Sequence, residues 1–107
     1  MRLPVKFTTL GDEIAIEERE VDGLGCFDTA TGAIAIHPAQ HPVGKLITLV
    51  HEAMHVGEST LGFEIDHDYI EGAAFGVAAI LIEAGAIEGL TSDDLRAFIR
   101  EQQKGAE

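Results

Sequence analysis

Residues 46–57 read LITLVHEAMHVG and contain the pattern His51-Glu52-x-x-His55. On an α-helix, residues four positions apart lie on one face, so both imidazoles can point at the same metal ion. Glu52 lies one position further round, where its carboxylate can take a proton from a water held by the ion. The apolar flanks indicate a packed helix, in which a buried His and Glu without a role would be costly. The stretch therefore predicts a zinc site with His51 and His55 as ligands.

Length and composition restrict what kind of protein this is. A chain of 107 residues predicts one domain, residues 1–107, with a modest core that a metal ion or a partner chain would help to stabilise. The net charge of -12 argues against nucleic acid or an anionic membrane as partner. The longest apolar run, residues 73–82, is too short to span a bilayer, and we see no signal peptide at the start. With Cys26 as the single cysteine, we expect a cytoplasmic protein without an intrachain disulfide.

Four short segments before the motif have the composition or the alternation that is typical of strands. They are residues 5–10, 13–18, 24–28 and 33–37. The last two are separated by a short loop in which Gly32 suits a positive φ, so we expect them to form a hairpin.

Three helices are expected in the rest of the chain. The first, residues 43–58, carries the motif and has Gly57 as its expected terminator. The second, about residues 66–84, is apolar nearly all round and is expected to be buried on most sides. The third begins at Thr91 or Ser92 with an acidic first turn. The predicted class is α+β, with a small antiparallel or mixed sheet of about four N-terminal strands packed on three helices.

A catalytic zinc usually has three protein ligands and one open position, so a third ligand must come from elsewhere in the chain. Glu71 is the favoured candidate, because a helix packed against the motif helix could deliver its carboxylate. Its spacing from Asp68 also suits a simple helix cap. His67 competes because imidazole is a common zinc ligand, and Glu58 shares the helix face of the two motif histidines. The alternatives Glu71, His67 and Glu58 stay open at this point.

Hydrolysis of a peptide bond passes through an oxyanion that needs a hydrogen-bond donor besides the metal. Tyr69 is the only tyrosine, and it lies close to Glu71 in sequence, as does His67. Either side chain is a candidate catalytic donor. The alternative is that Tyr69 packs at the start of its helix and that His67 is a solvated loop residue.

Three segments carry a resemblance to known peptidases: residues 32–36, the motif segment 48–55, and residues 71–81. Their order resembles the gluzincin arrangement of zinc peptidases and, more narrowly, the ImmA/IrrE-like metallopeptidases and the very small minigluzincins. The resemblance covers roughly residues 24–84. It implies a zincin-like fold in which His51, His55 and Glu71 hold zinc and Glu52 is the general base. It also implies that strand 33–37 is the edge along which a peptide substrate lies, by strand addition.

The expected function is a zinc metallopeptidase, an endopeptidase with one Zn2+ per chain that acts on a peptide or protein substrate. In the expected reaction a metal-activated water attacks the peptide bond while Glu52 takes and returns a proton. One alternative is a zincin-fold binding or regulatory module with structural or latent zinc, because so short a chain has little material for the wall of a substrate cleft. A metal-free structural protein is a further alternative. The oligomeric state is not predicted.

Overall fold

The computed structural model describes residues 6–9 and 12–105. Its elements, in chain order, are β1 (Lys6–Thr9), β2 (Asp12–Glu18), β3 (Gly25–Asp28), β4 (Ala33–Ile36), α1 (Pro42–Leu61), α2 (His67–Glu83) and α3 (Ser92–Gly105). The α+β class is confirmed. The first predicted strand included Val5 and Leu10, which lie outside the described residues.

The sheet is mixed, and its strand order is β1-β2-β4-β3. β1 pairs with β2 and β3 pairs with β4 in antiparallel fashion, whereas β2 and β4 are parallel. In this register Ile34 lies beside Ile16 on one neighbouring strand and beside Phe27 on the other. β4 is therefore central, and β3 and β1 form the two edges of the sheet.

The expectation that strand 33–37 forms the substrate-binding edge is thus wrong. β4 is paired on both sides, and all four of its residues, Ala33–Ile36, are buried. The physical reason is that β4 carries no polar side chain, and a strand covered on all sides is typically a continuous apolar run. The edge beside the motif helix is β3.

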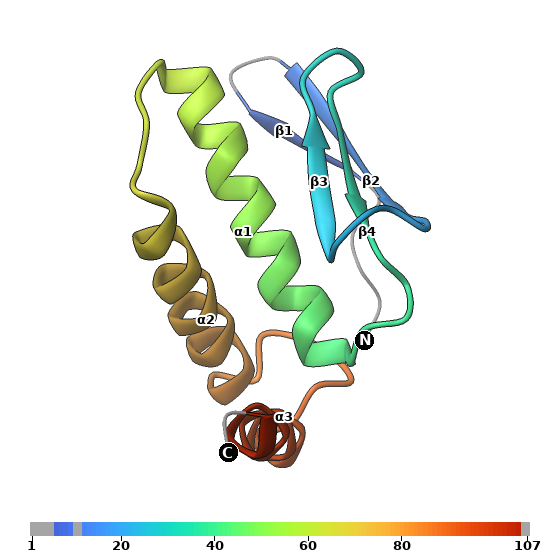
Figure 1. The fold of residues 1–107 in the computed structure, drawn as a ribbon, viewed down its shortest axis with the longest axis vertical. Helices are drawn as coiled ribbons and strands as arrows, with labels where there is room; N and C mark the ends of the chain where they lie inside the picture. The colour runs from blue at the N-terminus through green and yellow to red at the C-terminus, as the bar shows by residue number, and fades with distance from the viewer. Residues whose placement is uncertain (1–5, 10–11, 106–107) are drawn as a thin grey trace.

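Helix α1 lies in the middle of the molecule, with the sheet on one side and α2 on the other (Figure 1). Among the described elements, α1 alone contacts the sheet, so the predicted packing of the sheet on three helices is not found. The core between the sheet and α1 is made of Ile14, Ile16, Ile34, Ile36 and Val56. A second core lies among the three helices and contains Val43, Leu46, Ala78, Ile82, Leu90 and Leu95.

Helix α1 is longer than predicted, because it runs past Gly57 to Leu61 and is capped by Gly62, whose φ of 77° is left-handed. A glycine inside a helix costs only about 1 kcal/mol relative to alanine, so Gly57 weakens the helix without ending it. At the other end, His41 caps the helix by accepting a hydrogen bond from the Val43 N–H. The helix thus continues without a break through Glu58 and Ser59, which lie beside the motif.

Helix α2 is buried on one face only, along Ile70, Ala74, Ala78 and Ile82. The expectation that it is buried on most sides is wrong, because Tyr69 and Ile80 on the other face are 75% and 70% exposed. In the described part of the chain, no helix combines the length and apolarity needed to cross a bilayer. The cytoplasmic location stays a prediction.

Candidate metal centre

Three histidines meet where α1 faces the start of α2. One ring nitrogen from each of His51, His55 and His67 lies within 4.8 Å of the others, close enough to hold a metal ion. The Nε2 atoms of His51 and His55 are 3.2 Å apart, as expected for residues four apart on one helix. His67 is the first residue of α2, and residues 62–66 carry the chain from the end of α1 back to this point.

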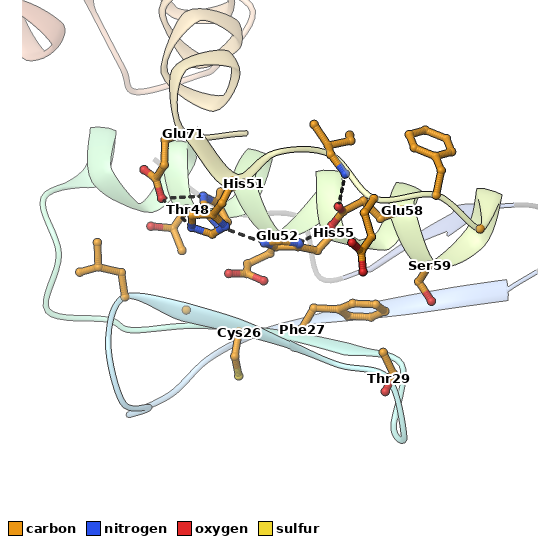
Figure 2. Close-up of a pocket in the computed structure, with 17 residues that line it drawn as sticks. Cys26, Phe27, Thr29, Thr48, His51, Glu52, His55, Glu58, Ser59 and Glu71 are labelled. Atoms are coloured by element: carbon orange, nitrogen blue, oxygen red, sulfur yellow. Dashed lines mark hydrogen bonds and ion pairs between the residues drawn. The ribbon is translucent and has the colours of Figure 1, made fainter. Parts of the chain in front are cut away.

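Two carboxylates contact the outer nitrogens of the motif histidines (Figure 2). The Oε1 atom of Glu71 is 3.2 Å from Nδ1 of His51 and 3.4 Å from Nε2 of His67. The Oε1 atom of Glu58 is 2.6 Å from Nδ1 of His55. Carboxylates in such positions hold imidazole rings in one orientation and in one tautomer. The Nε2 atoms of both motif histidines are left facing each other.

Glu58 also ties the loop after α1 to this centre. Its Oε2 atom accepts a hydrogen bond of 2.6 Å from the Ile65 N–H. This N–H, and after it the hydrogen bond with His55, hold the pKa of Glu58 below its ordinary value. Glu58 therefore fixes both a motif histidine and the loop that leads to His67.

Glu52 lies on the side of α1 that faces the sheet, and its side chain points into the space between α1 and β3 (Figure 2). The residue is only 8% exposed. Burial raises the pKa of its carboxyl, and the neighbouring histidines His51, His55 and His67 act in the opposite direction. A carboxylate with a raised proton affinity, next to histidines that could hold a metal ion, is suited to accept and return a proton.

Gly25 allows the edge strand to lie directly beneath this carboxylate. A Cβ atom at Gly25 would be 2.5 Å from Cγ2 of Thr48 and 2.9 Å from the Ala35 carbonyl oxygen, and it would be 3.7 Å from Cγ of Glu52. Neither Gly25 nor Thr48 was predicted from the sequence as part of the site. The only hint in the sequence is a glycine at the start of a predicted strand. Which helix that strand approaches depends on how strands distant in sequence pair, and a local pattern does not show this.

The cluster opens into a groove of about 1060 Å³ between β3, α1 and residues 62–65. Its lining includes Glu52, Glu58, Glu64 and Glu71, and within residues 6–9 and 12–105 no lysine or arginine contributes to it. Cys26 also lies along the groove, with its side chain directed away from α1 (Figure 2). The groove is thus an acidic channel bounded on one side by the free edge of the sheet.

The structure brings together most of the side chains that the sequence analysis singled out. His51, Glu52, His55, Glu71, His67 and Glu58 all line this groove. Tyr69 does not line it, and its side chain is 75% exposed. The structure therefore does not bring the predicted tyrosine donor to the site. It does bring His67 next to the two motif histidines, so His67 is not simply a solvated loop residue.

No protein-family model, curated protein or solved structure matches this chain. The resemblance to ImmA/IrrE-like metallopeptidases therefore stays a prediction from the motif segments. A function has to be inferred from the side chains that the fold brings together.

Proposed function

We propose that this chain is a zinc metallopeptidase with a zincin-like fold, which hydrolyses peptide bonds with Glu52 as general base. One observation carries the proposal: one ring nitrogen from each of three imidazoles lies within 4.8 Å of the others, beside the buried carboxyl group of Glu52. Zinc sites of the catalytic type use three protein ligands and leave one position open to a water or a substrate. The open groove in front of the cluster is consistent with such a position.

For the ligands we propose His51, His55 and His67, with Glu71 as the residue that orients His51. This changes the role expected for Glu71 from ligand to hydrogen-bond partner. The support is that Glu71 contacts Nδ1 of His51, while Nε2 of that ring points at His55. Three imidazole nitrogens are a donor set that suits zinc.

A bound zinc ion would supply a Lewis acid that polarises the scissile carbonyl and lowers the pKa of a water. Glu52 would accept the proton of the attacking water and return it to the leaving amine. Its burial between α1 and β3, beside both motif histidines, favours this role because the carboxylate is held next to the metal position and away from bulk water. Glu71 and Glu58 would keep His51 and His55 in the orientation that ligation requires.

For the substrate we propose an extended peptide that adds to the free edge of β3. β3 borders the groove along its length and, among the described strands, pairs with β4 alone. Main-chain hydrogen bonds to such an edge bind a peptide without requiring a particular sequence. The glutamates that line the groove favour neutral or basic substrate segments over acidic ones.

The first experiment is to load the purified chain with zinc, measure its metal content and incubate it with a library of extended peptides. We expect about one zinc per chain and cleavage that stops with a chelator and returns with added zinc. His67→Ala should lose most of the zinc, whereas Glu71→Ala should retain a weaker site. The reverse order would restore Glu71 as the third ligand.

Acetohydroxamate binding separates the peptidase from the alternative of a binding or regulatory module with structural zinc. An open catalytic position should bind this small chelating inhibitor at the metal, and a closed structural site should not. Zinc-loaded protein that binds no hydroxamate and cleaves no peptide would contradict the proposed peptidase. A chain that takes up no zinc would contradict both functions.

A further inference from the structure

A second hollow adjoins the groove at the end where α1 begins. It has a volume of about 1200 Å³ and lies between the start of β3, the first turns of α1, α2 and α3. We call this hollow the side cavity, and its large apolar lining residues are Leu24, Ile47, Phe75, Phe98 and Ile99. Leu24, Thr48 and Glu71 line both the groove and the side cavity, so the two spaces are continuous. Figure 2 shows Thr48 and Glu71 at the end of the groove opposite Ser59.

The side cavity has a floor and a rim of apolar side chains. Ile47, Phe98 and Ile99 are partly buried and pack against the core among the three helices, so they form a fixed floor. Leu24 and Phe75 form the rim, and they are 64% and 38% exposed. Exposed apolar side chains that gather around one hollow mark a place where another apolar group binds.

Hydrogen bonds fix the boundary between the groove and the side cavity. The Nε2 atom of Gln40 donates to the Leu24 carbonyl oxygen at 2.8 Å. The Oε1 atom of the same side chain accepts a hydrogen bond of 2.9 Å from Oγ1 of Thr48. The start of β3 is thus tied to α1 one turn before His51, which keeps the side cavity at a fixed position relative to the metal centre.

A peptide that lies along the free edge of β3 reaches the side cavity close to the cleaved bond. Gly25 lies beside the general base, because a Cβ atom there would be 3.7 Å from Cγ of Glu52. Leu24 is the preceding residue and lines the side cavity. Successive residues of an extended peptide advance by about 3.3 Å, so the side cavity begins within about two residues of the bond under attack.

The charges around the side cavity balance, in contrast to those of the groove. Two cations and two carboxylates line it among the described residues, namely Arg100, Lys104, Glu71 and Glu101. Nζ of Lys104 is 3.9 Å from Oε1 of Glu101. With His41 neutral, the lining favours neither a basic nor an acidic group. An uncharged apolar side chain is therefore the occupant that suits the side cavity best.

We propose that the side cavity is a specificity site that binds a large apolar side chain of the substrate peptide next to the cleaved bond. Such a site rests on the proposed peptidase function, and it narrows the substrate class. The preferred substrate is an extended peptide with neutral or basic residues along the groove and a residue the size of phenylalanine on the Leu24 side of the bond. Helix α3 lies at the end of the molecule where α1 begins (Figure 1), so it contributes to substrate choice through Phe98 and Ile99.

The main experiment compares the cleavage of matched peptides by the zinc-loaded chain. The peptides differ in one residue near the cleaved bond, which is phenylalanine, leucine, alanine or glutamate, and mass spectrometry locates the cut. We expect kcat/KM to be at least tenfold higher for phenylalanine than for alanine at one position on one side of the bond. A hydrophobic pocket typically discriminates about 10–200-fold for a single methylene, so this is a modest demand. Equal rates for the two residues at every position next to the bond would overturn the proposal.

Removal of part of the rim tests the side cavity itself. Phe75→Ala should lower the preference for phenylalanine over alanine at least threefold, because it removes apolar contact area from the site. Val77→Ala is the matched control, because Val77 is an apolar residue of the same helix, is 44% exposed and lines neither space. The zinc content of each variant, measured alongside, separates a loss of metal from a loss of the site. A preference that Phe75→Ala leaves unchanged would contradict the proposal.

Filling the side cavity should have the opposite effect on substrate size. Gly44 lines it, and a Cβ atom there would lie 3.5 Å from Oε1 of Gln40 and 3.6 Å from Cε2 of Phe98, which are ordinary contacts. Gly44→Ala should therefore be accommodated and keep most of the preference. Gly44→Leu places a large side chain in the space, so alanine peptides should become the better substrates. Identical preferences in the two variants would count against the side cavity.

Peptide binding without cleavage separates the specificity site from the proposed function. Zinc-loaded Glu52→Gln protein should bind the fluorescent phenylalanine peptide several-fold more tightly than the alanine peptide, and adding Phe75→Ala should remove the difference. If the wild type cleaves nothing but this difference in binding is found, the peptidase fails and the specificity site stands. If the wild type cleaves both peptides equally well, the specificity site fails and the peptidase stands. Peptides that are neither bound nor cleaved would contradict both.

Discussion

Glu52 and Glu58 are two glutamates on the same helix, each beside a motif histidine, and their surroundings shift their acidity in opposite directions. Burial between α1 and β3 raises the pKa of Glu52. The Ile65 N–H and then His55 lower the pKa of Glu58 at the end of α1. The difference separates two roles: a carboxylate with a raised proton affinity suits proton transfer, and one held as an anion by donors suits a fixed structural contact.

The largest expected effect removes the proton acceptor. Glu52→Gln should lower kcat of the proposed peptidase by on the order of a thousandfold, because general acid–base catalysis typically contributes 10²–10⁴-fold. The amide keeps the size of the side chain, so zinc content should stay at the level of the wild type. The measurement is single-turnover cleavage of the best library peptide, together with metal analysis. Activity close to that of the wild type in this variant would remove Glu52 from its role.

The corresponding change at the other glutamate should show the reverse pattern. Glu58→Gln should weaken zinc binding roughly 10–100-fold, the usual cost of removing a partner that orients a metal ligand. The rate at saturating zinc should change much less. Competition with a colorimetric chelator measures the affinity, and Glu64→Gln is the control because Glu64 is an exposed glutamate of the same groove. Equal zinc affinity in the two variants would contradict the role of Glu58.

The local part of the site could be predicted from the sequence. His51, Glu52 and His55 follow from helical periodicity, and their helix begins within one residue of the predicted start. The choice among the remaining ligand candidates could not be predicted. It depends on where residues 62–66 turn, and that turn is set by the left-handed Gly62 and by the hydrogen bond between Glu58 and Ile65.

The pairing of the strands is the second feature that could not be predicted from hydrophobic periodicity. The hairpin of β3 and β4 was predicted, but the parallel pairing of β2 with β4 joins segments that are not consecutive strands. That pairing moves the free edge from β4 to β3. The close approach of Gly25 to Thr48 depends on the same strand topology, so it cannot be predicted from a local sequence pattern.

A third change concerns Gly25 on β3, the strand that lies beneath Glu52. Gly25→Ala should destabilise the fold by about 1–3 kcal/mol, the usual cost of overpacking, because its Cβ would be 2.5 Å from Thr48 and 2.9 Å from the Ala35 carbonyl. Denaturant unfolding measures the change. Gly23→Ala is unsuitable as a control because its φ of 76° is left-handed. Gly57→Ala is suitable, because a Cβ there meets nothing within 4 Å, and it should stabilise the helix slightly.

The smallest expected effect concerns the metal-free protein, in which the two glutamates should contribute to stability with opposite signs. The folded-state pKa of Glu52 is raised, so folding is penalised at pH 7, where the carboxyl is charged in the unfolded chain. The penalty is absent below the unfolded pKa of about 4.3, because both states are then protonated. Glu52→Gln should therefore raise the melting temperature at pH 7, and the gain should disappear in acid.

For Glu58 the sign reverses, because its folded-state pKa is lowered. Its contribution is fully present above the unfolded pKa of about 4.3 and is lost as the pH falls through the folded value. Glu58→Gln should therefore lower the melting temperature at pH 7, and this loss too should shrink in acid. Circular dichroism of both metal-free variants at pH 7 and pH 3 measures the pair. Shifts of the same sign at pH 7 would contradict the opposite pKa shifts of Glu52 and Glu58.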